Sequence, residues 1–373
     1  MAQGIHTNAD ILTKLADGTD LTVLWNTYQQ VVNEWNSTRQ GIVSFLTYNV
    51  TDPVETIPVI GQDANFEKAS ELGVPKSYRP VPSYWQMGFK FDWFDLAARF
   101  SWQFLANASQ NQVDAIQNMA MEADSRLVVT EVLRTLFDNT NRDVSINKNA
   151  YKVYAFYNND GTVPPTYKNN TFLSSHNHYR GSNAATIDPQ DLEQQIQDLE
   201  EHGYTVQNGY TLATLVNKAE MNVIRTFKAG PADATHGTYD FIPSAVANQV
   251  LILPQNAVTL PAGFTPPSSF NGQQVMGSYG PLLIIQEDYI PLHYVVSFAT
   301  GGPESLQNPI GIRQMPQTGL QGMRLVKGPN PDYPLIDSYY IRGFGTGVRH
   351  RGAASVTQIV ASVTYTPPTA FLV

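Results

Sequence analysis

The residues of this chain that could do chemistry lie in a few short clusters, and the first is a pair of histidines. His176 and His178 are separated by one residue, so on an extended strand their imidazole rings would face the same side. Two imidazoles can share a transition-metal ion, but a zinc site needs a third protein ligand. Because no spacing in the sequence marks a third ligand, we expect no metal site here. A metal-dependent hydrolase that uses both histidines is kept as an alternative.

Carboxylates gather a little further along the chain. The acidic residues of this stretch are Asp188, Asp191, Glu193, Asp198, Glu200 and Glu201. Paired carboxylates can serve as general acid and base. The same stretch also carries the signals of a helix from Pro189 to His202, with Asp188 as N-cap residue and Gly203 just beyond its end. Because acidic side chains are favoured in the N-terminal half of a helix, we interpret them as a solvated face and predict no catalytic carboxylate.

Three glycines alternate near the C-terminus and could suggest a phosphate-binding loop. They are Gly343, Gly345 and Gly347. The dinucleotide fingerprint requires GxGxxG between a strand and a helix. The spacing here is GxGxG, and strand signals follow it. We therefore predict no cofactor.

The same window holds the dense basic patch of the chain, formed by Arg342, Arg349, His350 and Arg351. Guanidinium groups can pair with carboxylates of a neighbouring subunit or with nucleic-acid phosphates. We favour the first, because the formal net charge of the chain is −9 and an acidic protein repels phosphate. No G-x-S-x-G elbow and no P-loop is present. The sequence therefore predicts a protein that is not an enzyme.

Composition indicates a globular protein whose surface is partly covered by other subunits. Hydrophobic residues make up 42% of the 373 residues, but charged residues only 15%, against a typical value of about 25%. Interfaces are depleted in Lys and Glu and enriched in aromatic residues. The absence of cysteine excludes disulfides and thiolate metal sites. No segment approaches the roughly 18 apolar residues of a membrane span, and the first residues lack a secretory pattern.

The secondary-structure elements that must position these residues include both helices and strands. Apolar residues at helical spacing predict a helix from Leu21 to Asn36, which carries Trp25 and Trp35, and a long helix from Asn107 to Asp138. Alternation predicts a strand from Gly88 to Phe94 with Phe89, Phe91 and Trp93 on one face, followed by a helix. Short strands are expected between Ser338 and Thr366. The fold class is therefore α+β.

Several longer strings, taken in order, resemble one family. They are FEKASELGVP, MGFKFDWFDLAARFSWQFLA, ADSRLVVTEVLRTLFDNTNR, GTVPPTYKNNTF, LVNKAEMNVIRTF, YDFIP, GSYGPLLIIQEDYIP and DYPLIDSYYIRGFGTGVRHRGA. Together they resemble the major capsid proteins of tailed bacteriophages with the Hong Kong 97 fold, in particular those of phages that infect actinobacteria. The resemblance runs from about residue 60 to the C-terminus.

The resemblance implies an N-terminal arm (1–55), an extended loop region (56–105), a peripheral domain with a spine helix (106–184), an axial domain (185–325) and a return to the peripheral domain (326–373). It also implies that Gly343, Gly345 and Gly347 allow a close backbone approach at a turn or bulge. The candidate contacts between subunits are Trp25, Trp35, Phe89, Phe91, Trp93, Arg342, Arg349 and Arg351.

The implied function is structural. The chain would assemble with itself, as hexamers and pentamers, into an icosahedral shell that encloses double-stranded DNA without reading its sequence. A portal protein, and scaffolding or decoration proteins, would be its other partners. Assembly would take place in the host cytoplasm, and the product would be the virion capsid. A shell of the encapsulin type, which shares the fold but packages enzymes, is the main alternative.

Overall fold

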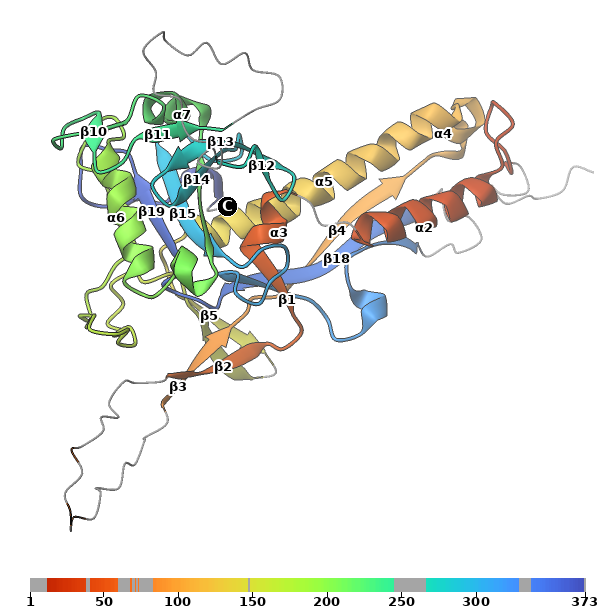
Figure 1. The fold of residues 1–373 in the computed structure, drawn as a ribbon. Helices are drawn as coiled ribbons and strands as arrows, with labels where there is room; N and C mark the ends of the chain where they lie inside the picture. The colour runs from red at the N-terminus through yellow and green to blue at the C-terminus, as the bar shows by residue number, and fades with distance from the viewer. Residues whose placement is uncertain are drawn as a thin grey trace, which may run out of the picture.

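Two sheets and one long helix organise the chain into a broad body and a rod that extends from it (Figure 1). The computed structural model describes residues 12–37, 41–59, 68, 71, 73, 83–146, 148–244, 266–328 and 337–371. Most of the predicted tip of the extended loop, residues 60–67, 69, 70, 72 and 74–82, lies outside them. The mixture of helices and several sheets confirms the predicted α+β class.

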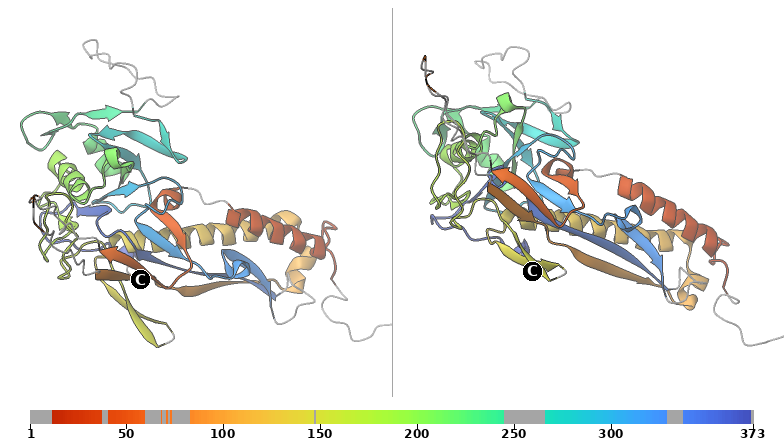
Figure 2. Two further views of the ribbon diagram at one scale, coloured as in Figure 1. Left: turned by 60° about the horizontal axis from the view of Figure 1, so that its bottom comes forward. Right: turned by 90° about the horizontal axis from the view of Figure 1, so that it is seen from below.

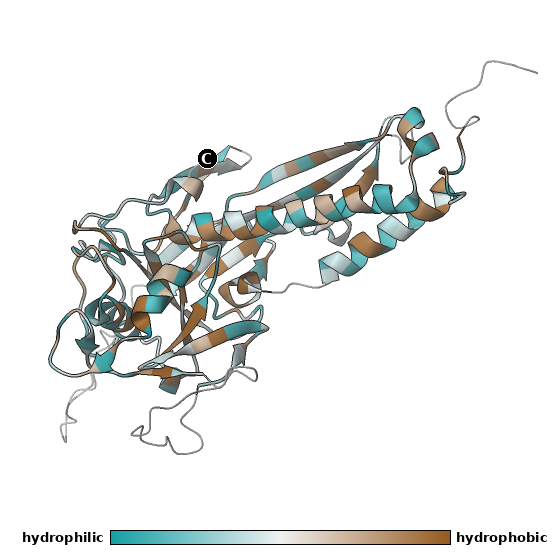
Figure 3. Cartoon of the chain, turned by 90° about the horizontal axis from the view of Figure 1, so that it is seen from above, coloured by the Kyte–Doolittle hydropathy of each residue, from teal (hydrophilic) through white to brown (hydrophobic). Residues whose placement is uncertain are grey.

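The long helix α5 (Gln110–Phe137) is the spine of the rod and confirms the predicted helix. It begins where the backbone N–H of Ser109 donates to Oε1 of Gln112 at 3.0 Å, which satisfies a free donor at the helix start. Its 28 residues give a length of about 42 Å. Polar and apolar residues are mixed along it (Figure 3). Its buried residues include Gln117 and Asp124, so the spine needs polar partners.

Helix α2 (Leu21–Ser37) lies beside α5 in the rod (Figure 3). It buries Leu24, Trp25, Tyr28 and Val32 in one apolar stripe, as the helical spacing predicts. The hydroxyl of Tyr28 donates to Oδ1 of Asp114 on α5 at 2.6 Å. The short helices α3 (Ile42–Leu46) and α4 (Trp102–Asn107) lie at the two ends of this layer.

A five-stranded sheet runs along the rod next to α5 (Figure 2). Its path is β1 (Thr47–Val50), β16 (Ile310–Arg313), β18 (Asp337–Val348) and β17 (Met323–Lys327), and β4 (Asp92–Arg99) pairs with the other edge of β18. The strand predicted at Gly88–Phe94 begins later and continues to Arg99, where a helix was expected. Eight antiparallel pairs with β18 override the local helical tendency of this segment.

An eight-stranded sheet forms the centre of the body. Its order is β11 (Phe241–Pro243), β13 (Gln273–Tyr279), β14 (Leu282–Gln286), β8 (Thr211–Val216), β15 (Tyr294–Thr300), β19 (Ala354–Gln358) and β7 (Tyr179–Gly181), with β12 (Ser269–Phe270) paired to β13. Strands β8, β14 and β15 are apolar and buried because helices α6 (Pro189–Glu200) and α7 (Lys218–Ile224) share a core with them.

Each of the two sheets draws its strands from distant parts of the chain. Strands β16 and β17 precede residue 328 and yet share a sheet with β18. Strand β19, which follows β18, joins the eight-stranded sheet instead. The predicted boundary between residues 325 and 326 therefore falls inside β17.

Smaller elements complete the described chain. Three two-stranded pairs are β2 (Val54–Val59) with β3 (Ser83–Gly88), β5 (Arg142–Ile146) with β6 (Asn149–Val153), and β9 (Lys228–Ala229) with β10 (His236–Gly237). Single 3-10 turns lie at η1 (Val206–Asn208), η2 (Thr318–Leu320) and η3 (Thr369–Phe371). None of the helices in the described ranges has the length and apolar character to cross a membrane.

Candidate assembly surface

The three alternating glycines lie inside strand β18 and leave one of its faces without side chains. A Cβ added at Gly345 would overlap the carbonyl oxygen of Lys90, and one at Gly347 would lie 2.6 Å from the carbonyl oxygen of Gly88. At Gly343 a Cβ would meet the ring of Trp93. Residues 88–91 therefore cross this bare face, and the backbone N–H of Lys90 donates to the carbonyl oxygen of Thr346 at 3.2 Å.

This crossing explains the glycine spacing. The close backbone approach is as expected, but it occurs within a continuous strand and not at a turn or bulge, because β18 runs unbroken from Asp337 to Val348. Strand side chains alternate between faces, so glycine at every second position clears one face only. The crossing segment connects β3, at the base of the predicted extended loop, to β4.

Arg342 lies on the opposite face of β18 and is held inside the subunit. Its Nη1 donates to Oδ2 of Asp124 on α5 at 2.5 Å, and Trp35 Nε1 donates to the same oxygen at 3.0 Å. One carboxylate thus joins α2, α5 and β18. The side chains of Arg342 and Asp124 are 14% and 6% exposed, so this ion pair is shielded from solvent.

Arg349 and Arg351 also find partners within the chain. Nε of Arg349 lies 3.2 Å from Oε2 of Glu55, next to the base of the β2–β3 hairpin. Arg351 donates from Nη2 to Oδ2 of Asp160 at 2.9 Å, and its side chain is 1% exposed. Its guanidinium also lies 4.8 Å from the ring centre of Tyr157. Within the subunit Arg351 therefore neutralises a carboxylate of its own chain.

The predicted aromatic contacts divide into interior and surface side chains. Phe89 and Trp25 are enclosed by their own subunit, at 0% and 6% exposure. Phe91 is half-buried, with the guanidinium of Arg313 5.1 Å from its ring centre. Trp93 is 46% exposed and is free to meet another chain.

Further apolar side chains are exposed along the rod, and the sequence reasoning did not single them out. They are Val23, Leu96, Trp102, Phe104 and Met119. Exposed apolar side chains that gather on one part of a molecule mark contact sites. Amphipathic spacing did not reveal them, because the same spacing also describes ordinary core-facing stripes.

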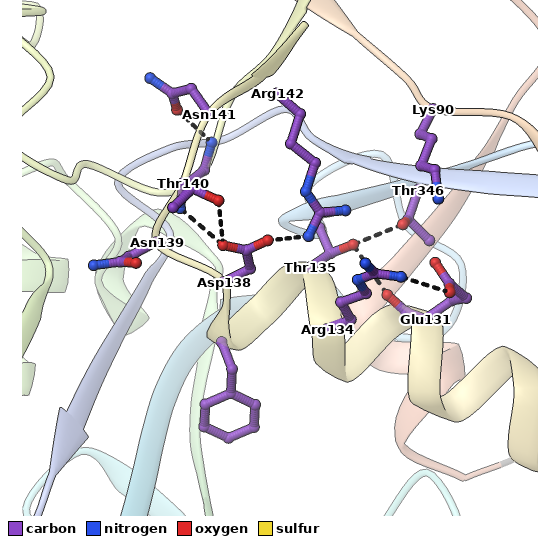
Figure 4. Close-up of polar contacts among 12 residues, drawn as sticks. Lys90, Glu131, Arg134, Thr135, Asp138, Asn139, Thr140, Asn141, Arg142 and Thr346 are labelled. Atoms are coloured by element: carbon purple, nitrogen blue, oxygen red, sulfur yellow. Dashed lines mark hydrogen bonds and ion pairs between the residues drawn. The ribbon is translucent and has the colours of Figure 1, made fainter. Parts of the chain in front are cut away.

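The body end of α5 is fastened by a polar cluster (Figure 4). The hydroxyls of Thr135 and Thr346 lie 2.6 Å apart, which ties the spine to β18. Asp138 accepts from the backbone N–H of Thr140 at 2.9 Å and pairs with Arg142. Burial would raise the pKa of Asp138, but these hydrogen bonds and the Arg142 charge lower it below the usual value. Asp138 is therefore ionised where the spine enters the body.

A histidine cluster lies where α6 ends, and it adds a third histidine that no spacing in the sequence had marked. His202, just after α6, places its Nε2 2.9 Å from Nε2 of His176 and 3.2 Å from Nε2 of His178. Oε1 of Glu201 lies 3.3 Å from Nε2 of His176. No spacing could reveal this, because His202 is brought in by the packing of α6 on the sheet.

Similarity to known proteins decides the family. No family model matches the chain, and neither does any curated protein. A solved chain of Mycobacterium phage Patience is 41% identical, with a TM-score of 0.74, and the match covers 100% of this chain and 97% of that one. This chain belongs to the phage major capsid proteins of the Hong Kong 97 fold. The resemblance read from the sequence is thereby confirmed.

More distant matches to this capsid protein include the capsid of an empty GTA particle, with 13% identity, a TM-score of 0.47, and coverage of 87% of this chain and 93% of that one. A chain of the bacteriophage PhiM1 mature capsid is 8% identical, with a TM-score of 0.46 and coverage of 87% and 89%. Its membership of the family, which the 41% identical chain shows, makes the capsid protein a shell component with a structural role.

Proposed function

We propose that this capsid protein assembles with itself, as hexamers and pentamers, into an icosahedral shell that encloses double-stranded DNA in a virion. The observation that carries the proposal is its 41% identity over the whole length to a chain of a mycobacterial phage. A portal protein, and scaffolding or decoration proteins, are the further partners. Shell assembly takes place in the host cytoplasm.

The shape of the subunit supports assembly through many modest contacts. A rod that projects from the body presents area to neighbours without enlarging the core. Each exposed apolar side chain that becomes covered contributes about 25 cal/mol per Å² before the cost of association. In this proposal α5 is the spine of the peripheral domain, residues 1–55 form the arm, residues 56–105 form the extended loop region, and residues 185–325 supply most of the axial domain.

Trp93 is the side chain that we assign to a contact between subunits. It projects from β4 over the bare face of β18 and remains 46% exposed. Phe89 lies four residues earlier on the same segment and is fully buried. These two aromatic residues form a matched pair, because one can lose contacts with a neighbour and the other can lose only contacts within its own subunit.

The direct test is expression of the full chain alone and with the scaffolding and portal genes of its phage, followed by electron microscopy. Closed shells with pentameric vertices are expected. Nuclease-protected double-stranded DNA in particles made during infection supports the phage capsid. Particles that carry a cargo enzyme and no DNA support the encapsulin-type alternative. Absence of any shell under all these conditions contradicts the proposal.

The matched substitutions test the assignment of Trp93. Trp93→Ala is expected to lower the yield and thermal stability of particles while changing the unfolding of the unassembled subunit by less than about 1 kcal/mol, as for a surface side chain. Phe89→Ala should destabilise the subunit itself by about 3–5 kcal/mol, the usual loss for a buried phenylalanine. Equal losses in subunit stability for both variants would place Trp93 in the core.

A further inference from the structure

The histidine cluster joins two segments of the chain, one before β7 and one after α6. His176 and His178 come from the segment before β7, and Glu201 and His202 follow α6. The Nε2 atoms of His176 and His178 are 2.9 Å apart. The possible ligand atoms of all four residues lie within 4.8 Å of one another.

Hydrogen bonds among the imidazoles satisfy this arrangement only in part, because one N–H shared by three nitrogens leaves two lone pairs facing each other. Nδ1 of His178 lies 2.7 Å from the carbonyl oxygen of Ala354. A carbonyl oxygen only accepts, so Nδ1 carries the proton and Nε2 of neutral His178 is a bare lone pair. If His176 and His202 each donate to it from Nε2, their own Nε2 hydrogens face each other across 2.9 Å. Three nitrogens that converge on one point are instead satisfied together by a shared cation.

The surroundings hold the rings in this orientation. The ring of His202 stacks on Phe172 at 4.4 Å and on Tyr157 at 5.1 Å between centroids. A Cβ at Gly352 would lie 2.7 Å from the His202 ring, so the chain closes tightly behind it. Preorganised, neutral imidazoles are the form that binds metal.

We propose that His176, His178, His202 and Glu201 bind one divalent transition-metal ion, and that zinc is the ion that fits best. Three imidazole nitrogens and one carboxylate oxygen make up a four-ligand zinc set, whereas magnesium and calcium prefer oxygen alone. Ligand atoms around a tetrahedral zinc lie about 3.3 Å apart. The three nitrogens, now 2.9–3.2 Å apart, need to move by only a few tenths of an ångström.

An outer partner is also present. The bond from Nδ1 of His178 to Ala354 is of the type that orients a metal-bound imidazole. Ala354 is the first residue of β19, so the ion links the end of α6 to the β7–β19 edge of the central sheet. Glu201 also lines a surface pocket of about 420 Å³ together with Gln197 and Glu200. The role of the ion is to brace the body of the subunit.

The site is tested on the purified full-length protein by measuring bound metal after dialysis against equimolar Zn²⁺ and by titration with Co²⁺. We expect one ion per subunit and the strong visible absorption of tetrahedral Co²⁺. His176→Gln should reduce affinity at least about tenfold, since loss of an outer-shell partner already costs 10–100-fold. His236→Gln is the matched control, because His236 is a partly exposed histidine that pairs with Asp233 outside the cluster.

Thermal unfolding gives a second readout. A chelator should lower the unfolding temperature of the zinc-loaded wild type and leave that of His176→Gln unchanged. Less than one tenth of an ion per subunit in the wild type would overturn the proposal. Equal zinc affinity in the wild type and His176→Gln, or equal losses in His176→Gln and His236→Gln, would also overturn it.

Discussion

The bare face of β18 allows a sharp test at Gly345. Replacement by alanine places a Cβ against the carbonyl oxygen of Lys90 and 2.8 Å from the Cα of Phe91. These are backbone atoms, so no rotamer change can relieve the overlap. The crossing segment must withdraw by roughly 1.5–2 Å to restore ordinary contact, and overpacking of this kind costs about 1–3 kcal/mol.

The withdrawal also weakens the bond from Lys90 N to Thr346 O, now 3.2 Å long, which adds about 1 kcal/mol. We therefore expect Gly345→Ala to lose about 2–4 kcal/mol of the free energy of unfolding. Gly343→Ala should lose less, because its obstacle is the ring of Trp93, a half-exposed side chain that can move. The large loss at Gly345 would also displace the base of the predicted extended loop and reduce particle yield.

Urea unfolding of the unassembled subunit, followed by circular dichroism, measures these losses. Gly319→Ala is the control, because a Cβ there meets nothing within 4 Å. It should change the free energy of unfolding by less than about 0.5 kcal/mol. A Gly345→Ala subunit as stable as the control, or one more stable than Gly343→Ala, would refute the crossing as the reason for these glycines.

Two ion pairs give further predictions. Asp124→Leu leaves the buried Arg342 charge without its partner and should cost about 3–5 kcal/mol in urea unfolding. Asp124→Leu combined with Arg342→Met should cost less than either single change. Additive losses in the double variant would contradict this coupling. At Asp160, burial would raise the pKa, but Thr162 and the Arg351 charge lower it from 3.8 to about 2. The lowered pKa stabilises the fold above about pH 4, and this contribution is lost as the pH falls toward 2. Asp160→Asn should flatten that part of the stability–pH curve, and an unchanged slope would contradict the assignment.

The helices were predictable because their signals are local. Apolar spacing and caps within a few residues define α2, α5 and α6, and Asp188 caps α6 as expected, accepting from the backbone N–H of Asp191 at 3.0 Å. The extension of β4 to Arg99 was not predictable in this way, because its partner β18 lies more than 200 residues away. Local preference favoured a helix there, and pairing with β18 outweighed it.

The candidate functional residues also divide into features that the sequence predicted and features that depend on tertiary packing. Residue types alone indicated a structural protein without a nucleophile or phosphate loop, and the ordered strings identified its family. The residue types could not identify the partner of each arginine. An arginine that can pair with a carboxylate of a neighbouring subunit can equally pair with Asp124, Glu55 or Asp160 of its own chain.

The sequence by itself therefore determined the helices, the α+β class and the family, because apolar spacing, caps and the ordered strings are formed by residues close in sequence. The partner of each arginine, the crossing over the three glycines and the convergence of His202 on His176 and His178 depend on how distant segments pack. The spacing of residues along the sequence does not determine the spatial distances between these groups, because only folding brings the distant segments together.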